Sequence, residues 1–336
     1  MGILRALKYA GLVSVASGCA IVAYNAATAF TPSPRTSEES ILKDGGKVYR
    51  LPDGRIMEYF IHGNPASHCT LVAIHGANTT GKLFDLLNQW GIDNSVRIIA
   101  PSLPGFGKSE PKYNSDGVPS YDLGDWAQYT STFLQSLQID NFHVLGTSLG
   151  GPHAAALASV FPDRAKVQNV MLYVPLAPYG DQDATQPGGV YDPLHNSMLK
   201  SFGDMRGSPR KKRTIERLFF LPMLRALSPN NGDVARSIAS YWEGAFTCTT
   251  VIYQPWLFPW KTLGTETVAS NKQAPCRKVF IVSGTKDAVA PPHNQKKLSQ
   301  DITNSILITY EGAHEHSVVH PQSMIDHVSL LFKTAA

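Results

Sequence analysis

The sequence predicts an α/β fold built on a doubly wound, mostly parallel β-sheet. Short apolar runs rich in β-branched residues alternate with amphipathic segments along most of the 336-residue chain. The runs are typical of buried parallel strands, and the amphipathic segments are typical of the helices that connect them. The alternation stops after residue 179 and returns after residue 275, so one sheet that carries a large insertion is expected.

Residues 46–179 are predicted to form the first part of the core. The turn sequence Pro52-Asp53-Gly54 joins two strands, 47–51 and 55–61, in a hairpin. Four buried strands follow, at 70–74, 96–100, 141–145 and 167–174. Amphipathic spacing predicts helices at 121–137 and 149–161, the second of which ends before Pro162.

Residues 276–336 are predicted to complete the same core. Two further apolar runs, 279–283 and 305–310, have the length and composition of strands. Each precedes a helical segment, at 291–298 and 321–332. Because parallel strands need crossover connections, these segments are expected to add two strand–helix units to the sheet.

Residues 180–275 interrupt this pattern and have a different composition. A basic run at 210–213 precedes an apolar segment at 215–227, and many aromatic residues follow: Trp242, Phe246, Tyr253, Trp256, Phe258 and Trp260. Such an insertion is expected to be a helical lid over the carboxyl edge of the sheet, where ligands bind in α/β folds. Its apolar segment either packs on the core or faces a membrane.

The N-terminus, residues 1–30, is predicted to be a hydrophobic anchor or a signal segment, followed by a linker at 31–45. Residues 9–30 are uncharged and would extend about 33 Å as a helix, enough to cross a bilayer. The expected location is therefore at a membrane. Ala27-Thr28-Ala29 also resembles a signal cleavage site, which leaves secretion open, and an early region with arginine but no acid leaves an organelle open.

Composition excludes several classes of protein. The apolar fraction of 43% is that of a globular chain, and a net charge of +4 gives no indication of a nucleic-acid partner. The four cysteines lack the paired spacing of a zinc module or a disulfide framework. No metal and no cofactor is expected.

The sequence Gly146-Thr147-Ser148-Leu149-Gly150 directly follows a predicted strand and opens a predicted helix. Such a sharp turn strains the backbone at its centre, and the two flanking glycines leave room for it. It would raise the Ser148 hydroxyl above the sheet. Ser148 is therefore the predicted nucleophile, and the free Leu149 amide is a predicted donor to an oxyanion.

A nucleophilic serine needs a base and an acid that orients the base. Asp287 follows the predicted strand 279–283, and His314 follows the predicted strand 305–310, so both belong at the same sheet edge as Ser148. Asp287 is the predicted acid and His314 the predicted base. His316 is the alternative base, and a zinc site of His314, His316 and His320 lacks a carboxylate or thiolate at ligand spacing.

A second oxyanion donor is expected in the loop after the strand 70–74, which reads His75-Gly76-Ala77-Asn78. Gly76 permits close approach of the backbone to a reacting group. The Ala77 amide is the predicted donor.

With these motifs the sequence resembles the α/β-hydrolase fold superfamily, over residues 46–334. The resemblance rests on His75-Gly76, on the run Pro104-Gly105-Phe106-Gly107-Lys108-Ser109, on the Ser148 turn, and on the Asp287 and His314 segments. The N-terminal segment and the histidine-rich end resemble poorly characterised, membrane-anchored eukaryotic members. The resemblance implies a nucleophile at Ser148, an acid at Asp287, a base at His314 and oxyanion amides at Leu149 and Ala77.

A serine hydrolase that cleaves a carboxylic ester or related acyl bond through an acyl-enzyme is the expected function. Its partner would be a small acyl substrate, apolar because the predicted lid is rich in tryptophan. Two alternatives remain: an acyltransferase on the same triad, and a small-molecule-binding protein of this fold that turns over slowly or not at all. A serine at the nucleophile position disfavours the epoxide hydrolase and haloalkane dehalogenase branches, which the family resemblance associates with aspartate.

Overall fold

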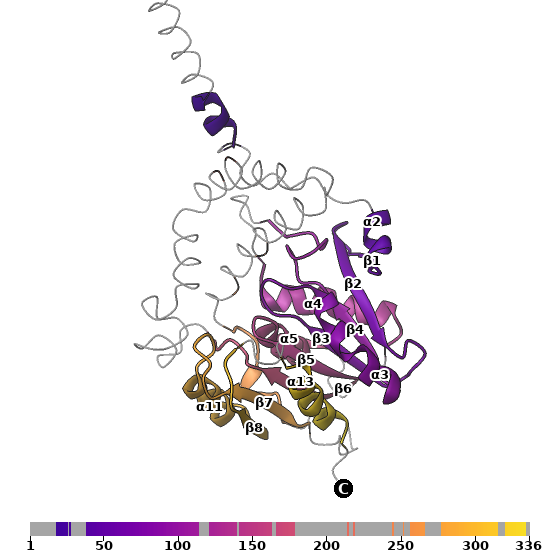
Figure 1. Ribbon diagram of the computed structural model, residues 1–336, viewed down its shortest axis with the longest axis vertical. Coiled ribbons are helices and arrows are strands. Elements are labelled where there is room, and N and C mark those ends of the chain that lie inside the picture. The colour runs from indigo at the N-terminus through magenta and orange to yellow at the C-terminus, as the bar shows by residue number, and fades with distance from the viewer. Residues whose placement is uncertain are drawn as a thin grey trace, which may run out of the picture.

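The computed structural model describes residues 18–25, 27, 38–113, 121–139, 141–162, 166–178, 214, 218, 244, 251, 256–265, 277–314 and 320–333. Eight strands of this part of the chain form one sheet in the order β1-β2-β4-β3-β5-β6-β7-β8. Strand β2 pairs antiparallel with β1 and with β4, and all the other pairs are parallel. The predicted doubly wound, mostly parallel sheet is confirmed (Figure 1).

The strands lie close to their predicted positions. They are β1 (Lys47–Arg50), β2 (Ile56–Gly63), β3 (Thr70–Ile74), β4 (Arg97–Pro101), β5 (Phe142–Thr147), β6 (Val167–Tyr173), β7 (Val279–Gly284) and β8 (Ser305–Tyr310). The hairpin of β1 and β2 has Arg50 opposite Ile56, on either side of the predicted turn. Every residue of β3 and β7 is buried, as the continuous apolar runs imply.

Helices cover both faces of the sheet. One face packs on α4 (Leu123–Ser136), α5 (Gly150–Val160) and α11 (Pro292–Asp301). The other face packs on the 3₁₀ helix η1 (Gly81–Leu87) and on α13 (Pro321–Val328), which continues as the 3₁₀ helix η5 (Ser329–Phe332); α3 (Asn88–Asp93) follows η1. Strand side chains alternate accordingly: Val72 and Ile74 belong to the first face, and Leu71 and Ala73 to the second.

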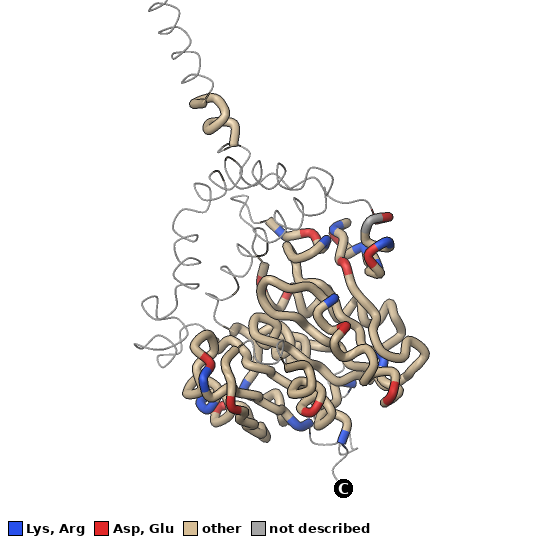
Figure 2. The backbone as a smooth tube through the Cα atoms, viewed as in Figure 1, with Lys and Arg blue, Asp and Glu red and all other residues tan. Residues whose placement is uncertain are grey.

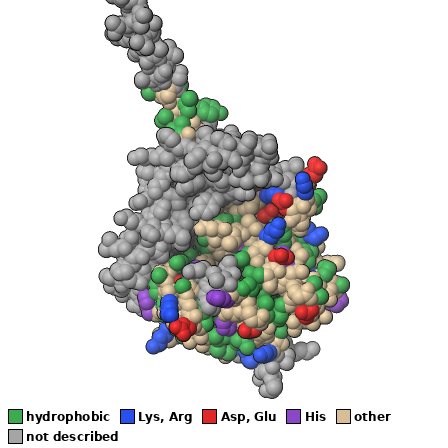
Figure 3. Space-filling model, in the orientation of Figure 1, with side chains coloured by type: hydrophobic (Ala, Val, Ile, Leu, Met, Phe, Trp, Pro, Cys, Tyr) green, Lys and Arg blue, Asp and Glu red, His purple; other side chains and the backbone are tan. Residues whose placement is uncertain are grey.

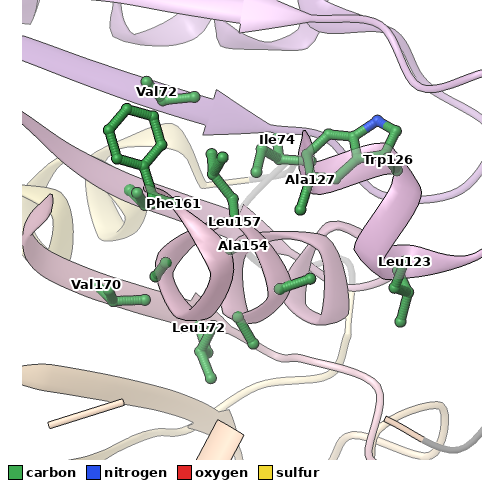
Figure 4. Close-up of a cluster of buried hydrophobic side chains, with 14 of the residues drawn as sticks. Val72, Ile74, Leu123, Trp126, Ala127, Ala154, Leu157, Phe161, Val170 and Leu172 are labelled. Carbon is green, nitrogen blue, oxygen red and sulfur yellow. The ribbon is translucent and has the colours of Figure 1, made fainter. Parts of the chain in front are cut away.

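The first of these two core layers centres on α5. Figure 4 shows Ala154 and Leu157 of α5, and Phe161 just after it, against side chains of β3 and β6: Val72, Ile74, Val170 and Leu172. All ten residues from Gly150 to Ser159 are buried, which agrees with the apolar character of the predicted helix on nearly every side. This burial anchors the N-terminus of α5, where the predicted nucleophile lies.

Two local differences from the sequence analysis concern short elements. Residues 38–43, within the range predicted as linker, form the helix α2 (Glu38–Lys43). Acidic residues in its first turn and Lys43 in its last complement the helix dipole, and Ile41 is buried. Helices η1 and α3, between β3 and β4, were not predicted, because neither is long enough to display a helical period.

The predicted lid and the predicted N-terminal anchor lie mostly outside the described residues. Of 180–275, the structure describes Thr214, Leu218, Gly244, Val251 and residues 256–265. Val251, Trp256, Phe258 and Leu263 of this range are buried in the core layer around α5. Within the described residues, no helix has the length and hydropathy needed to span a bilayer.

Candidate active site

The turn between β5 and α5 holds Ser148 in a strained conformation. Ser148 has a φ of +51°, a left-handed value that is costly for a residue with a side chain. Its amide donates to the Tyr173 carbonyl at 2.9 Å, and its carbonyl accepts from the Gly151 amide at 2.9 Å. A Cβ on Gly146 would lie 2.3 Å from the Gly150 carbonyl oxygen, so glycine is required there. Strain of this kind is typical of a nucleophile turn.

Ser148, His314 and Asp287 form a hydrogen-bonded line at the carboxyl edge of the sheet. His314 Nε2 lies 2.8 Å from Ser148 Oγ, and His314 Nδ1 lies 2.8 Å from Asp287 Oδ2. These residues follow β5, β7 and β8, whose ends are adjacent because the strands are parallel neighbours of β6 or of one another. The structure thus brings together the three side chains predicted as nucleophile, acid and base.

Asp287 is held so that only one of its oxygens faces the histidine. Its Oδ1 accepts hydrogen bonds from the Val289 amide at 2.8 Å and the Ala290 amide at 2.7 Å. The Asp287 side chain is fully buried, whereas the His314 side chain is 18% exposed. Backbone donors stabilise the carboxylate, and its Oδ2 accepts from His314 Nδ1–H. A neutral imidazole in this tautomer presents its Nε2 lone pair to the Ser148 hydroxyl.

The loops that carry the two predicted oxyanion amides meet at Ser148. Leu149 follows Ser148 in the chain, and a Cβ placed on Gly76, the residue before Ala77, would be 3.0 Å from Ser148 Cβ and 3.6 Å from Ser148 Oγ. Among the hydrogen bonds of the described residues, neither the Leu149 nor the Ala77 amide has an acceptor. Two free amides beside a nucleophile can bind the oxyanion of a tetrahedral intermediate.

The structure describes two of the three histidines considered for the base or for a zinc site, His314 and His320. His316, the alternative base, lies outside the described residues. His320 is exposed and precedes α13. In the described part of the chain, no three metal-binding side chains gather at one point.

Three residues near the site were not predicted from the sequence to have a role of their own. They are Glu58, His153 and His75, of which only His75 was named, as part of a motif. His75 and His153 are fully buried, and Glu58 is 3% exposed. His153 Nδ1 donates to the Leu149 carbonyl at 2.8 Å, and its Nε2 accepts from the Tyr121 hydroxyl at 2.6 Å. The sequence around a single histidine or acid does not show that its side chain is buried. Position 153 is a partial exception, because it falls on the apolar side of a predicted helix.

Burial makes three histidines neutral in the folded protein. Loss of hydration lowers the pKa of His75 and of His143 from 6.5 to about 4, and that of His153 to about 3. Burial also raises the pKa of Glu58, so the folded chain takes up this proton more readily than the unfolded chain. Glu58 therefore contributes stability as the pH falls, opposite to the histidines.

These shifts predict that the protein loses stability in mild acid. Between pH 6.5 and about 4 the unfolded chain binds protons on these histidines that the folded chain does not, so stability falls as the pH falls. We expect a loss on the order of 2 kcal/mol per histidine at pH 4.5, reduced by Glu58. Urea unfolding at pH 7 and 4.5 measures it, and His143→Gln should flatten the dependence. Equal unfolding free energies at both pH values would contradict it.

Charged residues do not single out another site. Lys and Arg are interspersed with Asp and Glu over the described part of the chain (Figure 2). On the face drawn in Figure 3, basic, acidic and apolar side chains likewise alternate without a single-sign patch.

Comparison with known proteins defines the class. Residues 59–320 match the family model of the alpha/beta hydrolase fold. The chain therefore belongs to the alpha/beta hydrolase fold family, as the resemblance implied.

Similarity to individual proteins is more limited. The chain is 31% identical over 161 residues to the dihydrolipoyllysine-residue acetyltransferase component of an acetoin cleaving system from Cupriavidus necator, covering 47% of this chain and 38% of that protein. It is 30% identical over 132 residues to 2-hydroxy-6-oxononadienedioate/2-hydroxy-6-oxononatrienedioate hydrolase 1 from Pseudomonas putida, covering 36% and 43%. Both relatives are thus matched over less than half their length.

A solved structure shares the fold over its whole length. An esterase from Exiguobacterium antarcticum superposes with a TM-score of 0.59 at 16% identity, covering 86% of this chain and all of the esterase. At this identity the likeness extends to the fold alone.

Proposed function

We propose that the protein is a serine hydrolase that cleaves a carboxylic ester or a related acyl bond. The observation that carries the proposal is the line from Ser148 Oγ through His314 to Asp287, with 2.8 Å at each step. The two free amides beside Ser148 and the esterase and hydrolase names among similar proteins support it.

The reaction follows from the hydrogen bonds of the line. Ser148 Oγ attacks the acyl carbonyl while His314 Nε2 takes the hydroxyl proton, and the carbonyl oxygen becomes an oxyanion facing the Leu149 and Ala77 amides. The intermediate collapses to an acyl-enzyme as the alcohol leaves with the proton from His314. Water then attacks the acyl carbon of the acyl-enzyme and gives a proton to His314. The carboxylic acid leaves, and Ser148 Oγ regains that proton from His314.

Asp287→Asn is expected to lower kcat by roughly 10⁴-fold with little change in fold. Because the Val289 and Ala290 amides require an oxygen at the Oδ1 position, the new amide group would face His314 Nδ1. It would donate there, leave the proton on Nε2 and remove the lone pair that accepts from Ser148. Ester hydrolysis measures the effect, and Asp326→Asn, at an exposed position of α13, is the control. Equal rates for Asp287→Asn and the parent would exclude Asp287 as the acid.

The experiment that tests the function is hydrolysis of 4-nitrophenyl esters with acyl chains from acetyl to decanoyl. A burst of nitrophenol equal to the enzyme concentration, absent from Ser148→Ala, is expected for an acyl-enzyme. The same assay with added alcohol or thiol separates hydrolysis from acyl transfer, since a transferase would form the new ester or thioester. Binding of the esters without turnover would favour the third reading, a small-molecule-binding protein.

A further inference from the structure

The Ala77 amide owes its direction in part to His75. The Gly76 carbonyl accepts from His75 Nδ1 at 2.6 Å, and since a carbonyl only accepts, the ring proton is on Nδ1. The described chain contains no cis peptide bond, so the Ala77 amide points away from the Gly76 carbonyl. The Thr79 hydroxyl donates to the same carbonyl at 3.1 Å, so His75 and Thr79 together hold the peptide plane whose N–H is the proposed oxyanion donor.

His75 is in turn held by the turn after β4. Its Nε2 accepts from the Leu103 amide at 2.8 Å, which is possible only for the neutral ring with the proton on Nδ1. The carbonyl at the other end of the same peptide, that of Ser102, accepts from the Ser109 hydroxyl at 2.7 Å. Both polar groups of the Ser102–Leu103 peptide are thus occupied, and a shift of this turn would move the histidine.

Glu58 is the buried acid on which this turn rests. Its Oε2 accepts from the Ser102 hydroxyl at 2.9 Å and from the Lys108 amide at 3.3 Å. A Cβ on Gly107 would lie 2.3 Å from the same oxygen, so the turn packs directly on the carboxylate. The Glu58 backbone is also bonded to the turn, through its amide to Ser109 Oγ at 3.0 Å and its carbonyl to the Ser102 amide at 2.9 Å. An acid that is only 3% exposed is costly to bury, and the cost is offset only by such donors.

We propose that Glu58 is a positioning residue for the oxyanion-binding amide of Ala77. It acts through the Ser102–Leu103 peptide and the neutral ring of His75, and it touches no substrate atom. This inference rests on the proposed serine hydrolase function and adds to it a residue on β2, far from the triad in sequence.

The test compares Glu58→Leu, which removes the acceptor, with Glu58→Gln, which keeps one oxygen at the same place. Full-length proteins are titrated with a fluorophosphonate to count reactive Ser148, and kcat is expressed per titrated site. We expect Glu58→Leu to lower kcat roughly 10- to 100-fold with KM nearly unchanged, part of the loss typical of one oxyanion donor. A trifluoromethyl ketone, whose hemiketal carries an oxyanion, should lose affinity by the same factor. Glu58→Gln should recover most of the rate.

Glu110→Leu is the matched control, because the Glu110 carboxylate likewise accepts a backbone amide, that of Ile56 in β2 at 2.8 Å, but lies outside the chain of bonds to His75. If Glu58→Leu does not fold, Ser102→Ala removes the hydroxyl that donates to Glu58 and accepts from the Gly81 amide, while the Lys108 amide still donates to Glu58. It should show the same split at roughly 3- to 10-fold. A per-site kcat within twofold of the parent, or a raised KM with unchanged kcat, would overturn the inference. A parent protein whose Ser148 does not react would instead refute the proposed hydrolase on which it rests.

Discussion

Ser148→Ala is expected to lower kcat for ester hydrolysis by roughly 10⁴- to 10⁶-fold while the protein stays folded. The change removes the Oγ that lies 2.8 Å from His314 Nε2, and with it the atom that would form the acyl-enzyme. Hydrolysis of the best 4-nitrophenyl ester gives the rate, and thermal unfolding checks the fold. Alanine keeps the hydrogen bonds of the Ser148 backbone to Tyr173 and Gly151, so the turn itself should persist.

The control for this variant is Ser131→Ala. Ser131 is a buried serine in α4 whose hydroxyl bonds the Ala127 carbonyl at 2.8 Å, away from the site. It should keep the parent rate within about twofold, as expected of changes outside the reacting groups. Residual activity of Ser148→Ala above a few per cent of the parent would mean that another group attacks the substrate.

His314→Ala is expected to reduce kcat by a factor similar to that of Ser148→Ala, because the serine loses the acceptor of its proton. The effects should not multiply: the double variant should be about as slow as either single one, since the residues act as a unit. The pH dependence should also change, with the residual rate of the variant rising with hydroxide rather than levelling off.

His316→Ala and His320→Ala are the comparisons that identify the base. His314 contacts both Ser148 and Asp287, whereas His320 is exposed before α13. Both comparison variants are expected to retain most of the parent activity. A loss at His316 equal to the loss at His314 would contradict the assignment of His314 as base.

Much of the fold was predictable because the chain encodes it locally. Short apolar runs predicted the strands, and both the buried strand β3 and the edge strand β8, whose residues are half-buried or exposed, have the bounds that their runs indicated. The short helices α2, η1 and α3 were missed because six or seven residues do not show a period. The residues predicted as lid and anchor lie mostly outside the described chain, so those two predictions stay predictions.

Part of the candidate site could likewise be predicted from the sequence, and part could not. Ser148, Asp287 and His314 each lie in the turn or loop after a strand, and parallel strands bring such positions to one edge, so their meeting could be foreseen. Glu58 could not be foreseen, because its role depends on burial beneath a turn that starts 44 residues later in the chain. Only the packing of the turn after β4 against β2 shows that an acid in a strand is connected to the oxyanion loop.

The most direct test of the central claim is labelling of the full-length protein with a fluorescent fluorophosphonate, beside Ser148→Ala. Such a probe forms a covalent bond with a serine only when a base activates it. The proposed triad predicts stoichiometric labelling of the parent, on the peptide that contains Ser148, and none of the variant. A folded parent that stays unlabelled, or a variant that labels as fast as the parent, would contradict it.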